Sequence, residues 1–200
     1  MIVLSILICS IPERKESLHQ LLYYLAEQQG ENKSKIEIIV DNDPTLLVGT
    51  KRRYLLEQAK GQFVVFIDDD DKVSDDYIRK IVRCIETNPE VDCIAISGLI
   101  KFNGAESKRW HISKEYGHWY EKDGVYYRTP NHISPVRREL SLQASFEDIS
   151  IGEDFKYSMA LLPLLKKEAK INGLLYFYDY KQPAPKEIPD ANGIFRKPFR

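Results

Sequence analysis

The sequence has few cysteines and no excess of either charge. Its three cysteines, Cys9, Cys84 and Cys93, are scattered and show no paired Cys/His spacing of the kind that metal sites use. This argues against a disulfide framework and a structural zinc site, and it favours a reducing compartment. Lys and Arg together number 29 and Asp and Glu number 30, so the formal net charge is -1. Nucleic-acid-binding proteins normally carry a large basic excess, and we therefore expect no nucleic-acid partner.

Long apolar runs are also missing. The apolar opening, residues 1–11, is too short to cross a bilayer. It lacks the basic leader and the small-residue cleavage site of a signal peptide. With 43% hydrophobic and 30% charged residues in a chain of 200, the composition is that of a globular protein with one ordinary domain. We expect a soluble, cytoplasmic protein without a transmembrane segment.

The first half of the chain alternates apolar runs with helical patterns. Continuous β-branched runs predict buried strands, and apolar residues spaced three and four apart predict the helices between them. The expected strands span residues 2–9, 36–40, 63–67 and 91–100, and the expected helices span 12–30, 50–61 and 74–88. This order predicts right-handed βαβ units, and hence an α/β fold with a mostly parallel central sheet flanked by helices.

The second half of the chain is less regular. A hairpin turn is expected at Asn103 and Gly104, and a short strand at residues 125–128. A helix is expected from Gly152 to about Lys170, interrupted at Pro163, and a closing strand at residues 174–180. Residues 183–200 are rich in proline and are expected to form an irregular tail.

Acidic residues follow two of the expected parallel strands. Asp41 and Asp43 come after the second strand, and four consecutive aspartates, 68–71, come after the third. Since ligands bind beyond the carboxyl ends of parallel strands, these acids should meet at one edge of the sheet. Clustered carboxylates repel one another unless solvent or a divalent cation offsets the repulsion, and such oxygen ligands suit Mg²⁺ or Mn²⁺ bound together with phosphates. The alternative is a solvated acidic turn that leads into the next helix.

These motifs, in this order, resemble the family 2 glycosyltransferases of the GT-A fold. The resemblance begins with Ile-Leu-Ile-Cys-Ser-Ile-Pro-Glu-Arg at residues 6–14 and Ile-Ile-Val-Asp-Asn-Asp at 38–43. It continues with Gly-Thr-Lys-Arg-Arg at 49–53 and with the run 59–71, which ends in the D-x-D-like aspartates. Gly-Glu-Asp at 152–154 is similar to the family's Glu-Asp motif. The resemblance covers roughly residues 2–180 and implies a single GT-A domain over 1–182, with a nucleotide-binding half (1–100) and an acceptor-side half (101–182).

The resemblance implies a role for each motif residue. Asp41 would accept a hydrogen bond from the nucleotide base, and Asp70 would ligate the cation that bridges the diphosphate. Asp154 would be the general base that deprotonates the acceptor hydroxyl, with Glu153 as the second candidate. The full nucleotide-binding set is Ile11, Arg14, Asp41, Asp43, Lys51, Arg52, Asp68 and Asp69. The metal set is Asp70, Asp68 and His132, and the sugar and acceptor set is Trp119, His132 and Asp71.

The implied function is a metal-dependent, inverting sugar transfer of the hexosyltransferase type, with Mn²⁺ or Mg²⁺ as cofactor. The donor would be a nucleotide sugar, with a UDP-sugar favoured, and the acceptor a hydroxyl on a glycan or another molecule. Aromatic rings suit the apolar faces of sugars, but core and hairpin packing is the better explanation for any one of these residues, Trp119 included, and explains His132 equally well. Two other classes stay open: an aspartate-based phosphotransferase or phosphatase, and a non-catalytic nucleotide-sugar-binding module. The phosphatase folds usually carry their motif on the first strand, whereas here it follows two complete strand–helix units.

Overall fold

The expected strand–helix units form the centre of the fold. In the computed structural model, which describes residues 1–102 and 104–180, each predicted unit appears within a few residues of its expected bounds. The units run in the order β1 Leu4–Cys9, α1 Lys15–Gln29, β2 Ile36–Asp41, α2 Val48–Gln58, β3 Phe63–Phe66, α3 Tyr77–Thr87 and β5 Cys93–Phe102. Pro12 opens the short 3-10 turn Pro12–Arg14 that leads into α1, where its missing N–H costs nothing.

The central sheet is mixed, and its core is parallel. Strand β1 lies between β2 and β3 and pairs in parallel with both. The sheet continues from β3 through the two-residue strand β9 Val136–Arg137, which is antiparallel, to β5. Beyond β5 it is extended by β6 Lys108–Ile112, β8 Val125–Arg128 and β7 Tyr120–Lys122. The chain is therefore an α/β domain whose sheet has a parallel core, as the strand pattern predicts.

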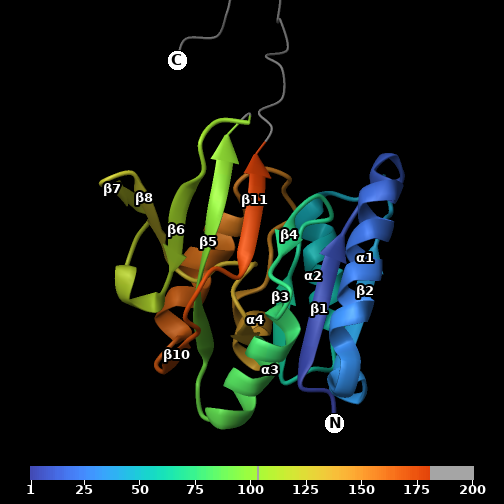
Figure 1. The fold of residues 1–200 in the computed structure, drawn as a ribbon, viewed down its shortest axis with the longest axis horizontal. Coiled ribbons are helices and arrows are strands. Elements are labelled where there is room, and N and C mark those ends of the chain that lie inside the picture. Colours follow the sequence, from blue (N-terminus) through green and yellow to red (C-terminus); the bar gives the residue numbers. More distant parts are fainter. Residues whose placement is uncertain (103, 181–200) are drawn as a thin grey trace, which may run out of the picture.

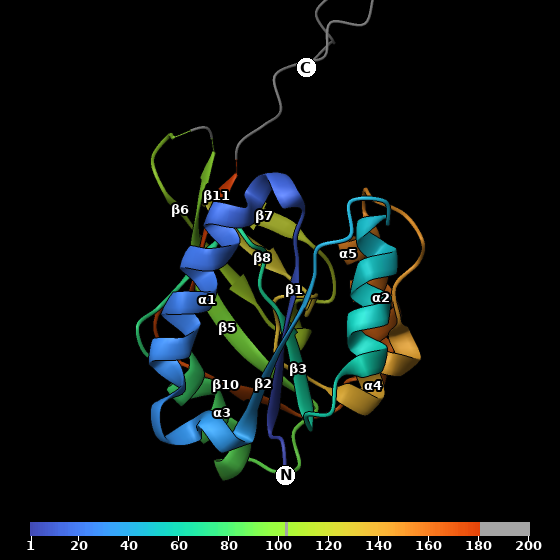
Figure 2. The ribbon, with the colours of Figure 1, turned by 90° about the vertical axis from the view of Figure 1, so that its right-hand side faces the viewer.

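Helices cover both faces of the sheet (Figure 2). Helices α1 and α3 lie on one face, and α2, α4 Arg138–Ala144 and α5 Glu153–Leu161 lie on the other. Each layer has its own apolar core. The larger core joins α1 and α3 to the sheet through side chains such as Leu25 and Ile81, and the smaller one joins α2, α4 and α5 through Leu56 and Tyr157. Two buried layers on a common sheet hold the strand ends in fixed positions.

One predicted helix of the second half is too long. The helix expected to reach Lys170 ends at Leu161, and a 3-10 turn, Leu162–Leu164, follows with Pro163 in its first positions. Proline cannot donate the backbone hydrogen bond that would continue the helix. Residues Glu168–Lys170 instead form β10, which pairs in parallel with β5. The predicted strand 125–128 and the closing strand, β11 Tyr176–Tyr180, are confirmed.

Three short elements were not predicted. Neither β9 nor α4 in the second half was expected, and β4 Lys72–Val73 in the first half, which pairs with β11, was missed as well. The predicted hairpin is confirmed as the antiparallel pair β5–β6, but Asn103 in its turn lies outside the described residues. The predicted tail, 183–200, also lies outside them. Within the described ranges, no helix is both long and apolar enough to cross a membrane.

The topology brings the acidic motifs together. Strands β1, β2 and β3 run in the same direction, and Cys9 at the end of β1 lies opposite Asp41 at the end of β2. The segment after β3 begins the aspartate run at Asp68. Because parallel strands end at the same edge of a sheet, the loops after β1, β2 and β3 meet there.

Candidate active site

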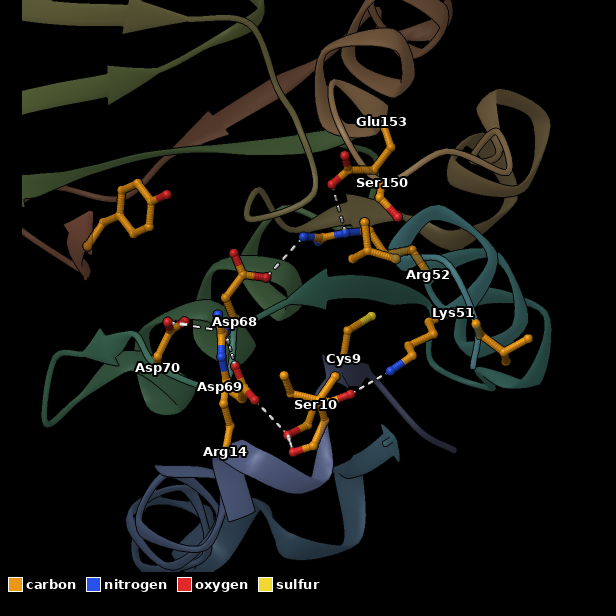
Figure 3. A pocket seen from close by; sticks show the side chains of 14 residues that line it. Cys9, Ser10, Arg14, Lys51, Arg52, Asp68, Asp69, Asp70, Ser150 and Glu153 are labelled. Atoms are coloured by element: carbon orange, nitrogen blue, oxygen red, sulfur yellow. Dashed lines mark hydrogen bonds and ion pairs between the residues drawn. The ribbon is translucent and has the colours of Figure 1, made fainter. Parts of the chain in front are cut away.

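A cleft of about 770 Å³ lies at the carboxyl ends of β1 and β3 (Figure 3). Its floor comes from the loop after β1 and from the aspartate run, and its walls come from α2 and the start of α5. The predicted site residues that line it are Ile11, Arg14, Lys51, Arg52, Asp68, Asp69, Asp70 and Glu153. The cleft lies at the strand ends where the sequence analysis placed the aspartate run, and the structure brings these residues together around one space.

Close backbone packing fixes the position of α2 beside the cleft. The Gly49 N–H donates to the carbonyl of Ile149 over 3.0 Å. A Cβ on Gly49 would lie 1.9 Å from the carbonyl oxygen of Glu147, so only glycine allows this approach. Gly152, at φ 79°, then caps α5 and turns the chain so that Glu153 starts the helix at the cleft wall. These two glycines place the cationic helix and the Glu-Asp motif face to face.

Asp69 is a structural member of the aspartate run. It is 2% exposed, and it accepts hydrogen bonds from Ser10 Oγ at 2.6 Å and from Arg14 Nη1 at 2.8 Å. A buried carboxylate is stable only when it is paired in this way. Asp69 therefore fastens the loop after β1 to the loop after β3, and Ser10 belongs to the site although the sequence reasoning did not name it.

Asp70 is the most open of the aspartates. Its side chain is 48% exposed and lies 3.1 Å from Arg14 Nη1. Burial raises the pKa of Asp70, and Arg14 opposes that rise only in part. A carboxylate that is open on the cleft and incompletely neutralised is a suitable ligand for an added cation.

Asp71 faces away from the cleft floor. It is buried and accepts a hydrogen bond from the Tyr176 hydroxyl at 2.6 Å. The same hydroxyl accepts from the Asp68 backbone N–H at 3.2 Å. Tyr176 in β11 therefore holds both ends of the aspartate run, and Asp71 acts in this anchor rather than in the lining of the cleft.

Arg52 connects the two acidic motifs. Its side chain is 4% exposed and lies over the rings of Phe66 and Phe146, 5.3 and 6.0 Å from their centroids. It donates to Asp68 Oδ1 at 3.0 Å, and its Nε lies 3.6 Å from Glu153 Oε1 (Figure 3). One buried guanidinium thus spans the gap between the segment after β3 and the start of α5.

These contacts set the charge states of the two acids. Burial alone would raise the pKa of Asp68, but Arg52, followed by His132, holds it well below its usual range. Burial raises the pKa of Glu153, and Arg52 only partly offsets that effect. Asp68 is therefore a firm carboxylate at neutral pH, whereas Glu153 takes up a proton more readily than an ordinary glutamate.

Lys51 and Cys9 complete the inner wall. Lys51 Nζ donates to the backbone carbonyl of Ser10 at 2.5 Å, which ties α2 to the end of β1. Burial raises the pKa of the Cys9 thiol to about 12, with Arg52 opposing the rise. The thiol is therefore protonated at neutral pH, which excludes a thiolate nucleophile at this position.

Asp41 and Asp43 organise their own loop. Asp41 Oδ1 accepts from the Asp43 N–H at 2.9 Å, and Asp43 Oδ1 accepts from the N–H and the hydroxyl of Thr45. Neither aspartate lines the cleft, although Asp41 lies opposite Cys9, which does. Their predicted contact with a nucleotide base stays a prediction.

His132 reaches the site from the second half of the chain. Its backbone carbonyl accepts from the Phe66 N–H, and its Nε2 lies 3.5 Å from Asp68 Oδ2. Neither ring nitrogen has a hydrogen-bond partner among the described residues, although both are buried. His132 therefore lies beside the aspartate run as predicted, with unused hydrogen-bonding capacity.

Trp119 and Asp154 lie together next to the cleft. The Trp119 indole N–H donates to Thr129 Oγ1 at 2.8 Å, and its ring packs edge-on against Phe155, 5.4 Å away. Asp154 sits in the first turn of α5, and its Oδ1 accepts from the Phe155 N–H at 2.8 Å. Burial lowers the pKa of Arg128, which stacks on Trp119, and Asp154 opposes that shift. None of these side chains lines the cleft.

The donor set fits a divalent cation. Asp68 and Asp70 present carboxylate oxygens to the cleft, and Mg²⁺ and Mn²⁺ are commonly held by one or two carboxylates together with substrate phosphates and water. In the described part of the chain, no group of three or more His, Cys, Asp or Glu side chains forms a complete metal cage. The remaining ligands would therefore have to come from substrate and solvent.

Several residues of the cleft were missed by sequence reasoning. Ser10 and Cys9 follow directly from the strand-end rule once it is applied to β1 as well as to β2 and β3. Ser150 and Tyr178 had no such signal, because α5 and β11 reach the cleft only through long-range packing and strand pairing.

Comparison with known proteins supports the resemblance. Residues 46–143 match the sequence model of the glycosyl transferase family 2, a stretch that includes Lys51, Arg52 and the aspartate run but not Glu153 or Asp154. No curated protein sequence matches the chain.

Solved structures with the same fold exist. A crystal structure of S. aureus TarS 1–349 superposes with a TM-score of 0.63 at 16% identity, covering 89% of this chain and 60% of that one. The same protein in complex with UDP-GlcNAc gives 0.63 at 16% identity, covering 92% and 60%. Its complex with UDP gives 0.63 at 17% identity, covering 90% and 61%. The chain thus spans about 60% of the length of these structures, and at such identity the likeness shows the fold alone.

The parallel strand ends that carry the aspartate run and the likeness to these solved structures show that this chain has the GT-A fold, and over residues 46–143 it is similar to the family 2 glycosyltransferases.

Proposed function

We propose that this chain transfers a sugar from a nucleotide-sugar donor to a hydroxyl group on a glycan-type acceptor, in a metal-dependent reaction that inverts the anomeric centre. The observation that carries this proposal is the cleft in which buried cations and open carboxylates converge at the strand ends. Its volume of about 770 Å³ lies within the usual range for small-molecule sites.

The charges of the cleft suit a nucleoside diphosphate. Arg14, Lys51 and Arg52 line it, so the negative charge of a diphosphate would meet fixed cations. Solved structures with the same fold have been obtained with UDP and with UDP-GlcNAc, which supports a UDP-sugar as the donor. Asp41 is the proposed partner of the nucleotide base. It lies at the end of β2, opposite Cys9 at the end of β1.

Asp70 and Asp68 are the proposed protein ligands of Mn²⁺ or Mg²⁺. When bound, the cation would stabilise the charge that develops on the leaving diphosphate. Asp68 is held as a carboxylate by Arg52, and Asp70 is open to the cleft, so both present anionic oxygens at neutral pH. His132, beside Asp68, is proposed to contact the same region of the donor.

The acceptor hydroxyl needs a base, and two neighbouring residues are candidates. Asp154 is proposed as the general base from the Glu-Asp motif, in a single displacement in which the acceptor attacks opposite the leaving group. Glu153 is the competing candidate, because it lines the cleft and burial raises its pKa, as suits proton transfer near neutral pH. Trp119 packs near Asp154 through Phe155 and is proposed to border the sugar and acceptor region with His132, whereas Asp71, predicted for the same region, is held in the anchor with Tyr176.

The geometry disfavours an aspartate nucleophile of the phosphatase type. Asp68, the first acid after β3, accepts a hydrogen bond from the buried Arg52, which stabilises its negative charge. A carboxylate whose charge is stabilised in this way is a weak nucleophile. A non-catalytic module would bind the nucleotide sugar without transferring the sugar, so a turnover assay is needed to distinguish it from a transferase.

A two-step experiment tests the proposal. Nucleotide sugars are first screened by thermal shift with and without Mn²⁺, because a ligand that binds only the native state raises its stability by about 2.7 kcal/mol at a hundredfold excess over Kd. The donor that stabilises the chain is then incubated with candidate glycans, and the anomeric configuration of the product is determined by NMR. An inverted product supports the proposal, whereas binding without any transfer would support the non-catalytic module.

A further inference from the structure

A second cavity lies away from the cleft, over β5, β6 and the segment that follows β10. Its volume is about 240 Å³, and no residue lines both spaces. Strands β5, β6 and β10 stand on the side of the sheet that is farther from β1 and β2 (Figure 1). A ligand in this cavity would therefore not occupy the proposed donor site.

The lining of this cavity is basic. Arg109 and His111 come from β6, and Lys170 comes from the end of β10. The polar neutral groups are Ser97 of β5 and Asn172, and none of the described residues that line the space is a carboxylate. Arg109 and Lys170 thus bring positive charge from two separate parts of the chain to one space, with His111 in the same lining.

The basic residues of this lining also have no ion-pair partners in the described part of the chain. Within residues 1–102 and 104–180, no ion pair involves Arg109, His111 or Lys170. Neighbouring basic residues are paired: Lys108 lies 2.9 Å from Glu121, and Lys80 lies 3.2 Å from Asp76. Unpaired like charges around one cavity repel one another, and an anion placed between them would relieve that repulsion.

His111 is held in a fixed orientation towards the cavity. Its Nδ1 lies 2.6 Å from Ser97 Oγ, its partner in the β5–β6 register, and its ring packs 5.7 Å from that of Tyr127. The hydrogen bond to Nδ1 leaves Nε2 as the nitrogen available to a ligand. Burial, and then Arg109 and Lys170, lower the pKa of His111. A bound anion would raise the pKa of His111.

We propose that this cavity binds a phosphate group, carried by free phosphate or by a phosphate ester. A guanidinium, an ammonium and an imidazole N–H, with a hydroxyl and an amide beside them, supply the several donors that a tetrahedral oxyanion accepts. The volume accommodates a phosphate group and a small substituent. The proposal is independent of the proposed transferase activity, because it rests on residues outside the cleft.

Imidazole NMR on the full chain tests the proposal directly. The chain has four histidines, so each signal can be assigned, that of His111 by its loss in His111→Gln. His132 beside Asp68 reports on the cleft at the same time. Inorganic phosphate is titrated at constant ionic strength, because screening alone would otherwise change the signals of exposed groups. Saturable changes at His111, with an upward shift of its pKa and little change at His132, are expected.

Variants and a second probe complete the design. Arg109→Ser combined with Lys170→Ser should weaken phosphate binding about ten- to hundredfold, the effect of losing hydrogen bonds to a charged ligand. Lys122→Ser, an exposed lysine of β7 outside the cavity, should leave the affinity unchanged. A sugar phosphate that binds more tightly than inorganic phosphate identifies an ester as the ligand, and equal affinities identify the free ion.

Three results would overturn the proposal. One is that phosphate causes no saturable change in the NMR signals of His111. This measurement uses the parent chain and does not depend on the folding of any variant. Another is an equal loss of affinity in Lys122→Ser, which would indicate a general charge effect. The third is competition by UDP, which would place the phosphate in the cleft.

Discussion

Replacement of Arg52 by methionine probes the connection between the two acidic motifs. Arg52 is 4% exposed and contacts Asp68 at 3.0 Å and Glu153 at 3.6 Å, so its removal leaves two carboxyl groups without their shared cation. Removing one partner of a buried ion pair costs about 3–5 kcal/mol. Because the Asp68 side chain is 30% exposed and can be solvated in part, we expect a loss of about 2–3 kcal/mol in the free energy of unfolding at neutral pH.

The loss should depend on pH in a defined direction. In the parent, Arg52 holds the pKa of Asp68 below its unfolded value, so this contribution to stability is complete above about pH 4 and is lost as the pH falls through the folded pKa. In the variant burial is unopposed by Arg52, and the pKa values of Asp68 and Glu153 rise. The penalty of Arg52→Met should therefore increase as the pH rises from about 5 to 7.5.

Urea denaturation at the two pH values measures this effect, with linear extrapolation to water. The next residue provides a matched control, because Arg53 also lies on α2 but pairs with Asp148 at the surface. Arg53→Met should cost far less and show no comparable rise with pH. Arg52→Lys should be intermediate, since it restores the charge but not the planar fork of donors. Equal losses for Arg52→Met and Arg53→Met, or a loss independent of pH, would refute the reasoning.

Three further predictions concern single contacts in the site. Ser10→Ala removes a hydrogen bond to the buried Asp69 and should lower the free energy of unfolding by about 1–3 kcal/mol in urea denaturation; an unchanged value would contradict the anchoring role. Asp41→Ala should weaken nucleotide binding by about 1–3 kcal/mol in calorimetry, with or without metal, and an unchanged affinity would remove Asp41 from the base pocket. Asp154→Asn should lower kcat about 10²–10⁴-fold at nearly constant donor affinity, with Glu153→Gln milder; the reverse order of severity would transfer the role of base to Glu153.

The parts of the fold that sequence could predict are those with local periodicity. The apolar run of β1 and the leucine spacing of α1 each specify their own element, and their alternation implies parallel strands. The strand-end rule then leads to Asp68 and Asp70 without knowledge of any contact. For this reason the edge of the sheet that carries the cleft and its acidic floor were accessible from the sequence pattern, whereas the basic residues of α2 followed only from the family resemblance.

The parts that sequence could not predict depend on distant partners. Strand β9 has only two residues, Val136–Arg137, and exists because β3 and β5 flank it. Residues Glu168–Lys170 have no strand pattern of their own and are extended because they pair with β5. The different roles of the aspartates also depend on how the loops pack against one another. Asp69 is buried against Ser10, whereas Asp70 is open to the cleft.

The most direct test of the account is calorimetric titration of UDP into the full chain with and without Mn²⁺, repeated on Asp70→Asn. Asp70 is half-exposed on the cleft, so its substitution should leave the fold and the thermal stability of the chain intact. We predict saturable UDP binding that Mn²⁺ strengthens in the parent and not in Asp70→Asn. Binding of UDP with the same Mn²⁺ dependence in both proteins would contradict the assignment of the metal site, and the absence of any UDP binding by the parent would contradict the proposed donor.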